Sequence, residues 1–385
     1  MDESRVNETI SEVAYLHQEL NWTNDQIATR LDKSAATVRR YLLKAAELGI
    51  LVQTYHLSMR ESQKADIHRR LFDKDDLQRG LQALSDVAND RLRSVSIVPV
   101  ASFGEEAARQ VAKLLVGVKN GDLRTIATAW GNDLRDTIGS LPQAFAREQR
   151  EQQKNRGGDR EDSTAARHIV RVLPARGELL QRRMSVAPTL LSRTLAKTLN
   201  GRDGYGASLM GVPAILPKPA QTGFTGGGVS LTADQLDMVI RQWYRNMPGV
   251  KKALDEHLRL LPVDGVLTSC GPAGPISDFT AECLKIGEFP EEEFSRLVMG
   301  DVAGILLPTP DLSQPDLRKL QAWQERWIGL DATGLDRAAD KGALGVVLIA
   351  KDQRKADAAA AAVRQGYCNH LIVSEVLADR IKALL

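Results

Sequence analysis

Residues 23–50, TNDQIATRLDKSAATVRRYLLKAAELGI, carry the pattern that decides the fold of the first part of the chain. Thr23 and Gln26 have the spacing of a capping box, in which each side chain bonds to the backbone of the other at the start of a helix. Residues 32–34 have turn-forming side chains, and Ser34 is a favourable N-cap for a second helix. Two short helices joined by a tight turn are typical of a helix-turn-helix.

Apolar residues recur at helical spacing in both predicted helices and in the segment before them. These rows are Ile10, Val13, Ala14, Leu16 and Leu20; Ile27, Ala28 and Leu31; and Val38, Tyr41, Leu42 and Ala45. We expect the first row to lie on a supporting helix that starts at Asn7. Gly49 is expected to end the last helix in the left-handed conformation, and a short strand is expected from Ile50.

The other face of the second helix is polar and basic. Residues 30–44 hold five basic side chains and one acidic side chain, a net charge of +4. Such a helix enters the major groove by its N-terminal end, which places Thr37 and Arg40 near base edges, and an Arg can bond guanine O6 and N7 together. The remaining polar side chains are better placed for phosphates. The candidate DNA-binding residues are Lys33, Ser34, Ala36, Thr37, Arg39, Arg40 and Lys44. The alternative is a three-helix packing unit with no role in DNA binding.

The composition is that of an ordinary globular protein. The chain has 385 residues, 43% apolar and 26% charged, with a net charge of +2, so it is long enough for two or three domains. Its three cysteines, Cys270, Cys283 and Cys368, are scattered, and we expect no disulfide framework, metal site or cofactor. The N-terminus is acidic, and no segment approaches the roughly 20 apolar residues that span a membrane. We therefore expect a cytoplasmic protein without a membrane partner.

Three regions are expected along the chain: a helix-turn-helix domain at 1–57, a polar linker at 58–75 and an α/β domain at 76–385. Buried strands are predicted at 94–100, 124–130, 169–174, 264–269, 302–307, 344–350 and 370–374. Helices are predicted at 104–118, 131–140, 183–199, 351–365 and 375–384. Strands that alternate with helices in this way favour a mostly parallel sheet covered by helices on both faces.

Two segments have the composition of insertions. The charged, Gln-rich residues 147–163 predict a helix extension followed by a loop, with a solvated surface favoured over nucleic-acid binding. The Gly-rich residues 201–230 predict long loops, and residues 231–260 predict helices broken near 248–249.

These features together resemble the SorC/DeoR-type sugar-responsive transcription regulators. The N-terminal resemblance rests on Thr23, Ile27, Ala28, Leu31, Ser34, Val38, Arg40, Ala46 and Gly49. In the larger domain it rests on residues 103–115 with 126–134, 171–202 with 211–217, 298–307, and 350–385, of which the last segment is the most specific. The resemblance implies a NagB/RpiA-like α/β sheet that binds its effector at the carboxyl ends of the strands, which is also where an open α/β sheet generally places a ligand.

Carried over by position, the resemblance implies twelve effector-binding residues. They are Thr128, Trp130, Gly131, Asn132, Asp133, Arg176, Gly177, Ser269, Cys270, Gly271, Asp301 and Lys355. Their chemistry suits a sugar, since loop amides and basic side chains bind anions and a carboxylate can hold hydroxyl groups. The chain departs from the family where Lys351-Asp352 replaces a Gly-Gly pair and where Asp133 replaces a hydroxyl residue. These departures indicate an atypical effector, such as an unphosphorylated sugar, a polyol or a larger conjugate, and they leave open whether the effector is phosphorylated.

The resemblance therefore implies a regulator of carbohydrate catabolism whose affinity for operator DNA is controlled by a sugar, polyol or sugar-phosphate effector. Repression is favoured over activation, and the sequence does not decide between them. Because one helix-turn-helix reads few base pairs, a dimer or tetramer built through the larger domain is expected. Two alternatives stay open. One is a sugar-phosphate isomerase or deaminase that uses Asp133 or Asp301 and carries a DNA-binding appendage. The other is an α/β domain that serves only assembly and binds no ligand.

Overall fold

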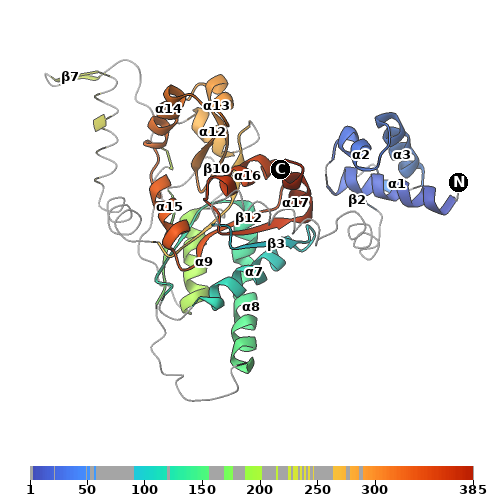
Figure 1. The fold of residues 1–385 in the computed structure, drawn as a ribbon, viewed down its shortest axis with the longest axis horizontal. Coiled ribbons are helices and arrows are strands. Elements are labelled where there is room, and N and C mark those ends of the chain that lie inside the picture. Colours follow the sequence, from blue (N-terminus) through green and yellow to red (C-terminus); the bar gives the residue numbers. More distant parts are fainter. Residues whose placement is uncertain are drawn as a thin grey trace. The chain divides into compact units, whose positions relative to one another are not determined.

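The computed structural model describes residues 3–20, 22–48, 50–52, 56–57, 91–118, 122–155, 169–176, 187–201, 214–215, 224–226, 229–232, 263–274, 278–285 and 289–384, with single residues between 235 and 246. The chain divides into two compact units, Met1–Lys74 and Asp75–Leu385 (Figure 1). The predicted linker at 58–75 lies outside the described residues, as do Gly49, Gly177 and most of the predicted helical segment 231–260.

The N-terminal unit is built from three helices and a small hairpin. Helices α1 (Glu3–Gln18), α2 (Asn24–Arg30) and α3 (Ala35–Glu47) are followed by the antiparallel strands β1 (Leu51–Val52) and β2 (His56–Leu57). The predicted capping box is present, since Thr23 Oγ1 accepts from the Gln26 N–H and Gln26 Oε1 accepts from the Thr23 N–H. Ser34 caps α3 as predicted, with Oγ accepting from the Thr37 N–H. The start of α1 was predicted too late: it begins at Glu3, an acidic residue that a helix N-terminus favours, and not at Asn7.

The core of this unit follows the predicted apolar rows. Ile10, Val13, Ala14, Leu16, Ile27, Val38 and Ala45 are all at most 2% exposed. Tyr41 packs against this core at its edge. The turn between α2 and α3 holds Asp32 at φ 51°, a left-handed conformation that Asp tolerates better than most residues. The predicted helix-turn-helix geometry therefore arises from local signals that agree with one another.

The larger unit is organised around a six-stranded parallel sheet in the order β3-β13-β12-β8-β4-β5. Its strands are β3 (Ser94–Val98), β4 (Thr125–Thr128), β5 (Arg171–Pro174), β8 (Gly265–Thr268), β12 (Gly345–Ala350) and β13 (His370–Ser374). Each neighbouring pair is parallel. Six of the predicted strands are therefore confirmed, together with their parallel arrangement.

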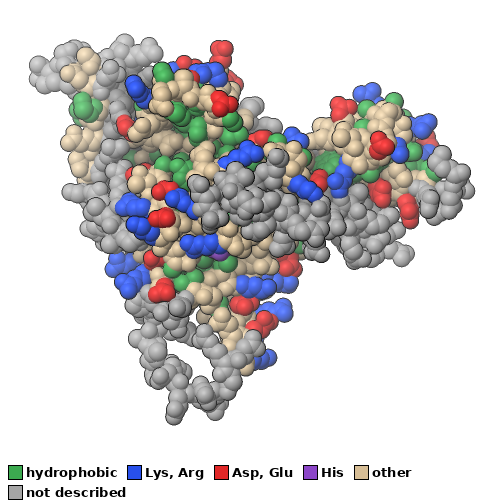
Figure 2. Space-filling model, viewed as in Figure 1, with side chains coloured by type: hydrophobic (Ala, Val, Ile, Leu, Met, Phe, Trp, Pro, Cys, Tyr) green, Lys and Arg blue, Asp and Glu red, His purple; other side chains and the backbone are tan. Residues whose placement is uncertain are grey.

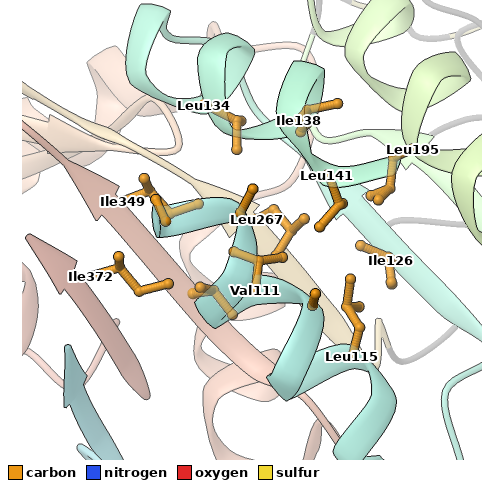
Figure 3. Packing of buried hydrophobic residues seen from close by; sticks show 14 of the residues in the cluster. Val111, Leu115, Ile126, Leu134, Ile138, Leu141, Leu195, Leu267, Ile349 and Ile372 are labelled. Carbon is orange, nitrogen blue, oxygen red and sulfur yellow. The ribbon is translucent and has the colours of Figure 1, made fainter. Parts of the chain in front are cut away.

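One face of the sheet is covered by α7 (Phe103–Gly117), α8 (Asn132–Asn155) and α9 (Pro188–Asn200). Figure 3 shows how Val111 of α7, Ile138 of α8 and Leu195 of α9 point toward strand residues such as Leu267 and Ile349. α8 is longer than the predicted 131–140 because its polar continuation extends the helix to Asn155, as the charged segment indicated.

The opposite face of the sheet is covered as well. Side chains alternate between the faces of a strand, so Val346 and Leu348 point away from the neighbours of Ile349, and both are fully buried. α15 (Ala332–Lys341) contacts β8 and β12, and α17 (Glu375–Lys382) contacts β3 and β13. Burial on both faces explains why these strands have consecutive apolar residues.

A second sheet of three antiparallel strands lies in the order β11-β10-β9. It consists of β9 (Cys270–Pro272), β10 (Val298–Val302) and β11 (Ile305–Pro308). Helices α12 (Asp278–Lys285) and α13 (Glu291–Leu297) lie between β9 and β10 in the sequence, and α14 (Gln314–Gln324) follows β11. The prediction of a single strand at 302–307 was wrong. Ala303 and Gly304 both have positive φ and turn the apolar run into a hairpin.

A short hairpin also interrupts the predicted loop segment 201–230. Strands β6 (Phe224–Gly226) and β7 (Val229–Leu231) pair antiparallel. Phe224 and Val229 are of residue types that favour strand conformation. The high glycine content of the segment led to the prediction of loops instead. No described helix is long and apolar enough to cross a membrane.

His370 gives the sheet a pH dependence that can be measured. It lies in β13 opposite Ser94 of β3, with Nδ1 2.7 Å from the Ser94 hydroxyl. Burial, aided by the charge of Arg93, lowers the pKa of His370 from 6.5 to about 4. The unfolded chain then binds the proton more readily than the folded chain between these two values, so stability falls as the pH falls through that window. We expect a loss of about 2 kcal/mol from this group between about pH 7 and pH 4.5.

Urea unfolding at both pH values measures this effect. His370→Gln keeps a polar side chain and removes the titration, so its loss on acidification should be smaller than that of the wild type by this amount. An equal loss in both proteins would refute the assignment to His370.

Candidate DNA interface and ligand site

The polar face of α3 is exposed. Lys33, Ser34, Ala36, Arg39, Arg40 and Lys44 are exposed, and Thr37 is half-buried. The hydroxyls of Ser34 and Thr37 are 2.9 Å apart, so these two side chains hydrogen-bond to each other at the start of α3. The guanidinium carbon of Arg40 lies 5.9 Å from the centre of the Tyr41 ring.

Arg39 and Arg40 are basic side chains of this face for which the described residues supply no ion pair. Lys44 bonds to Glu47 at 3.1 Å, whereas neither arginine pairs with an acidic side chain among the described residues. On the face drawn in Figure 2, basic and acidic side chains are interspersed over the N-terminal unit. Residues 30–44 nevertheless carry a net charge of +4, a local basic patch that suits a groove-binding helix better than a general coat for DNA.

The second candidate site lies where several strands of the large sheet end. The loop after β4 leads into α8, Ser269 lies between β8 and β9, and β12 leads into the short 3-10 helix η3 (Gln353–Lys355). Because the carboxyl ends of parallel strands meet at one edge of a sheet, these segments lie together. Gly131 has φ 142°, and a Cβ added there would lie 3.1 Å from the Ser269 Cβ, so a larger residue would be strained at this close approach.

Asp133 and Lys355 form a nearly buried ion pair at the centre of this edge. Lys355 Nζ donates to Asp133 Oδ2 at 2.6 Å and to Ser269 Oγ at 3.0 Å. Asp133 Oδ2 also accepts from the backbone N–H of Lys351 at 3.0 Å. The side chains of Lys355 and Asp133 are only 17% and 12% exposed. Three segments that are distant in the sequence are therefore joined by one polar cluster.

The ion pair and the burial of this cluster change the pKa values of Lys355 and Cys270. Burial alone would lower the pKa of Lys355, but the charge of Asp133 and the hydrogen bond to it raise that pKa above the ordinary value. Cys270 is buried beside it, and burial raises the pKa of the thiol to about 12. Lys355 is therefore charged and Cys270 is protonated at neutral pH, which makes the thiol a poor nucleophile.

Arg176 forms a second buried cationic group at the neighbouring hairpin. Its side chain is among the largest that are fully buried, and Nε donates to the carbonyl of Ala303 at 2.5 Å. Burial lowers the pKa of Arg176 to about 10, while the charges of Asp301 and Asp331 oppose this effect. Asp301 is also buried, and its Oδ2 accepts from the Gly304 N–H at 2.9 Å. At neutral pH Arg176 is charged.

Aromatic rings lie next to Arg176. Trp327 is 5.5 Å from its guanidinium carbon and stacks on Phe279 at 4.9 Å, and Phe279 stacks on Trp130 at 6.0 Å. A Cβ added at Gly304 would lie 2.8 Å from the Trp130 ring. The hairpin turn, the β4 loop and this aromatic row therefore belong to one packed region.

The structure brings together most of the predicted effector residues. Asp133, Ser269 and Lys355 are hydrogen-bonded, Cys270 Sγ lies 3.9 Å from the Lys355 carbonyl, and Gly271 pairs with Asp301 in the antiparallel sheet. Thr128 points elsewhere: its hydroxyl lies 2.6 Å from that of Ser192 on α9, and it is fully buried. Asn132 is exposed at the first position of α8.

Sequence reasoning missed Phe279, Trp327 and Gly304. The aromatic residues lie in segments whose pattern gave no reason to place them near the strand ends. Gly304 had a usable signal, because an Ala-Gly pair inside an apolar run can mark a turn. Among the described residues there is no group of three or more His, Cys, Asp or Glu side chains that could hold a metal ion.

Similar folds are found among solved structures of bacterial regulators. The full-length sorbitol operon regulator SorC from Klebsiella pneumoniae matches with a TM-score of 0.55 and 16% identity, covering 99% of this chain and 100% of that one. A domain described as sugar-binding in a transcriptional repressor from Vibrio fischeri matches with a TM-score of 0.51 and 18% identity, covering 81% and 99%. A transcriptional regulator from Streptococcus pneumoniae matches with a TM-score of 0.51 and 11% identity, covering 81% and 99%.

No family model matches the sequence, and no curated protein matches it significantly. The structural likeness extends over both units, and it confirms the predicted fold class: an N-terminal helix-turn-helix followed by a mostly parallel α/β domain, the fold of SorC-type regulators.

Proposed function

We propose that this protein is a DNA-binding transcription regulator whose affinity for its operator is controlled by a sugar-like effector. The observation that carries this proposal is the combination of two features in one chain: an exposed basic helix on a capped helix-turn-helix, and a polar cluster at the strand ends of the α/β unit. The likeness to the full-length sorbitol operon regulator supports it, because that likeness covers both units.

The N-terminal unit supplies DNA recognition. α3 enters the major groove, Arg40 contacts base edges and Arg39 contacts phosphate, assisted by Lys33 and Lys44 at the rim. The core of the unit leaves this face of α3 uncovered, since the buried residues of α3 are Val38 and Ala45. Operator DNA is the partner of this surface.

The α/β unit supplies control. Its effector binds between the β4 loop, Ser269 and the β10–β11 turn, next to the buried Arg176 and Asp301. Effector and DNA each favour one arrangement of the subunits, so each changes the affinity of the other by the same factor. A coupling of about 1–3 kcal/mol is enough for a change of ~5–150-fold. Assembly of a dimer or tetramer through this unit places two recognition helices on one operator.

The enzyme alternative finds less support in the site. Proton transfer on an open-chain sugar needs a carboxylate or His that can reach the substrate. Asp133 is bound by Lys355 and by the Lys351 N–H, and Asp301 accepts from the Gly304 N–H, so both carboxylates serve contacts within the protein.

Arg40→Ala tests the DNA-binding part of the proposal. We expect it to weaken binding to the operator by about 1–3 kcal/mol, roughly 5–150-fold, because a bidentate contact to guanine is lost. Arg39→Ala should instead weaken binding to all sequences alike and reduce the salt slope by about 1. Fluorescence anisotropy with operator and scrambled duplexes measures both effects.

Arg147→Ala is the matched control, since Arg147 is an exposed arginine on α8 of the other unit, paired with Glu151. It should leave DNA affinity unchanged. Equal operator affinity for Arg40→Ala and the wild type would show that α3 does not read the bases.

A further inference from the structure

One carboxylate oxygen of Asp133 accepts from two donors that could otherwise bind an anion. Asp133 Oδ2 takes both a backbone N–H, from Lys351, and an ammonium group, from Lys355, at 3.0 and 2.6 Å. A backbone amide combined with a lysine ammonium is the donor set that binds a phosphate oxygen. In this chain a side chain of the protein itself satisfies that donor set.

The nearby charges are also balanced. Asp352, the first acidic group after Lys351, is engaged by Arg354 through its side chain and backbone, and these bonds lower the pKa of Asp352 against the opposing effect of burial. The remaining buried cation, Arg176, lies within the field of the buried Asp301. In the described part of the site, each buried positive charge therefore has a carboxylate beside it.

Among the described residues of the site, the Ser269 hydroxyl is a group to which a ligand hydroxyl can bond. A neutral polyhydroxy compound can bind beside the Asp133–Lys355 pair without adding a charge to a nearly buried cluster that is already neutral.

We propose that Asp133 is a built-in counter-anion of Lys355 that makes the site select uncharged polyhydroxy ligands, such as free sugars or sugar alcohols, and reject phosphorylated ones. This inference rests on the proposed function in one respect, namely that the ligand is a sugar-like compound. The exclusion of phosphate by Asp133 is a property of the α/β unit, and it can be tested on the full-length protein without DNA.

The test uses inorganic phosphate as the probe and Asp133→Ser as the main variant. Serine removes the charge and leaves room beside Lys355, so phosphate should bind this variant about 10- to 100-fold more tightly than the wild type, as one or two charge-assisted hydrogen bonds are gained. Calorimetric titration gives the dissociation constants. Phosphate should also raise the melting temperature of the variant and leave that of the wild type nearly unchanged.

Two further variants identify the cause. Asp133→Asn removes the charge but keeps the volume, and it should show a smaller gain than Asp133→Ser. If Asp133→Ser does not fold without phosphate, the same titration on Asp133→Asn decides the matter, with phosphate affinity above that of the wild type expected. Lys355→Met combined with Asp133→Ser should abolish the gain.

The proposal is overturned if the wild type binds phosphate as tightly as the Asp133 variants do, or if folded variants gain no phosphate affinity. Either result would leave the DNA-binding proposal untouched. Conversely, a protein that fails to bind DNA but gains phosphate affinity in Asp133→Ser would refute the proposed function and keep this inference.

Discussion

Gly300→Ala should destabilise the protein by about 3 kcal/mol, although it adds a single methyl group. Gly300 lies in β10, between β9 and α16 (Ala356–Arg364), and a Cβ there would lie 2.5 Å from the Ala358 Cβ and 2.6 Å from the Gly271 carbonyl oxygen. Neither neighbour is the end of a flexible side chain, so the strand or the helix must shift. Chemical unfolding in urea measures the loss.

The matched control is the same substitution at Gly139, in the middle of α8. A Cβ there meets nothing within 4 Å, and alanine is favoured over glycine in a helix by ~0.5–1 kcal/mol. Gly139→Ala should therefore be stabilising. If the two substitutions change stability in the same direction, the close packing of β10 against α16 is wrong.

Lys355→Met should cost a similar amount, about 3 kcal/mol, for an electrostatic reason. The substitution leaves the carboxylate of Asp133 nearly buried without its cation, and breaking one side of such a pair is strongly destabilising. Replacing both partners is different, because two apolar side chains of similar size leave no buried charge. The double variant Lys355→Met with Asp133→Leu should therefore be more stable than Lys355→Met alone.

Urea unfolding of the wild type, both single variants and the double variant completes a double-mutant cycle. Additive losses would show that the two side chains do not interact in solution, contrary to the 2.6 Å contact.

The helix-turn-helix could be predicted from sequence because its determinants are local. The capping box of Thr23 and Gln26, the N-cap Ser34 and the apolar rows all lie within a few residues of the structure that they specify. The central strands could be predicted for a related reason, since burial on both faces leaves consecutive apolar residues, as in 344–350. The order of these strands in the sheet follows from no such local signal.

The ligand site was predictable only in part. Asp133 and Lys355 are 222 residues apart, and no periodicity links them; the resemblance to a family placed both near a ligand without indicating that they bind each other. The run 302–307 misled because apolar content does not distinguish one strand from a hairpin. The left-handed backbone at Ala303 and Gly304 turns this run into a hairpin, and apolar content gives no indication of it.

The central claim is that a ligand in the α/β unit changes the affinity of the helix-turn-helix for DNA. The most direct measurement is the dissociation constant of the full-length protein for the DNA upstream of its own gene, determined by anisotropy with and without each member of a panel of free sugars, sugar alcohols and their phosphates. At least one uncharged polyhydroxy compound should change that constant by ~5–150-fold, and the DNA should change the affinity for that compound by the same factor. Specific DNA binding that no compound in the panel alters, or no specific binding at all, would contradict the account.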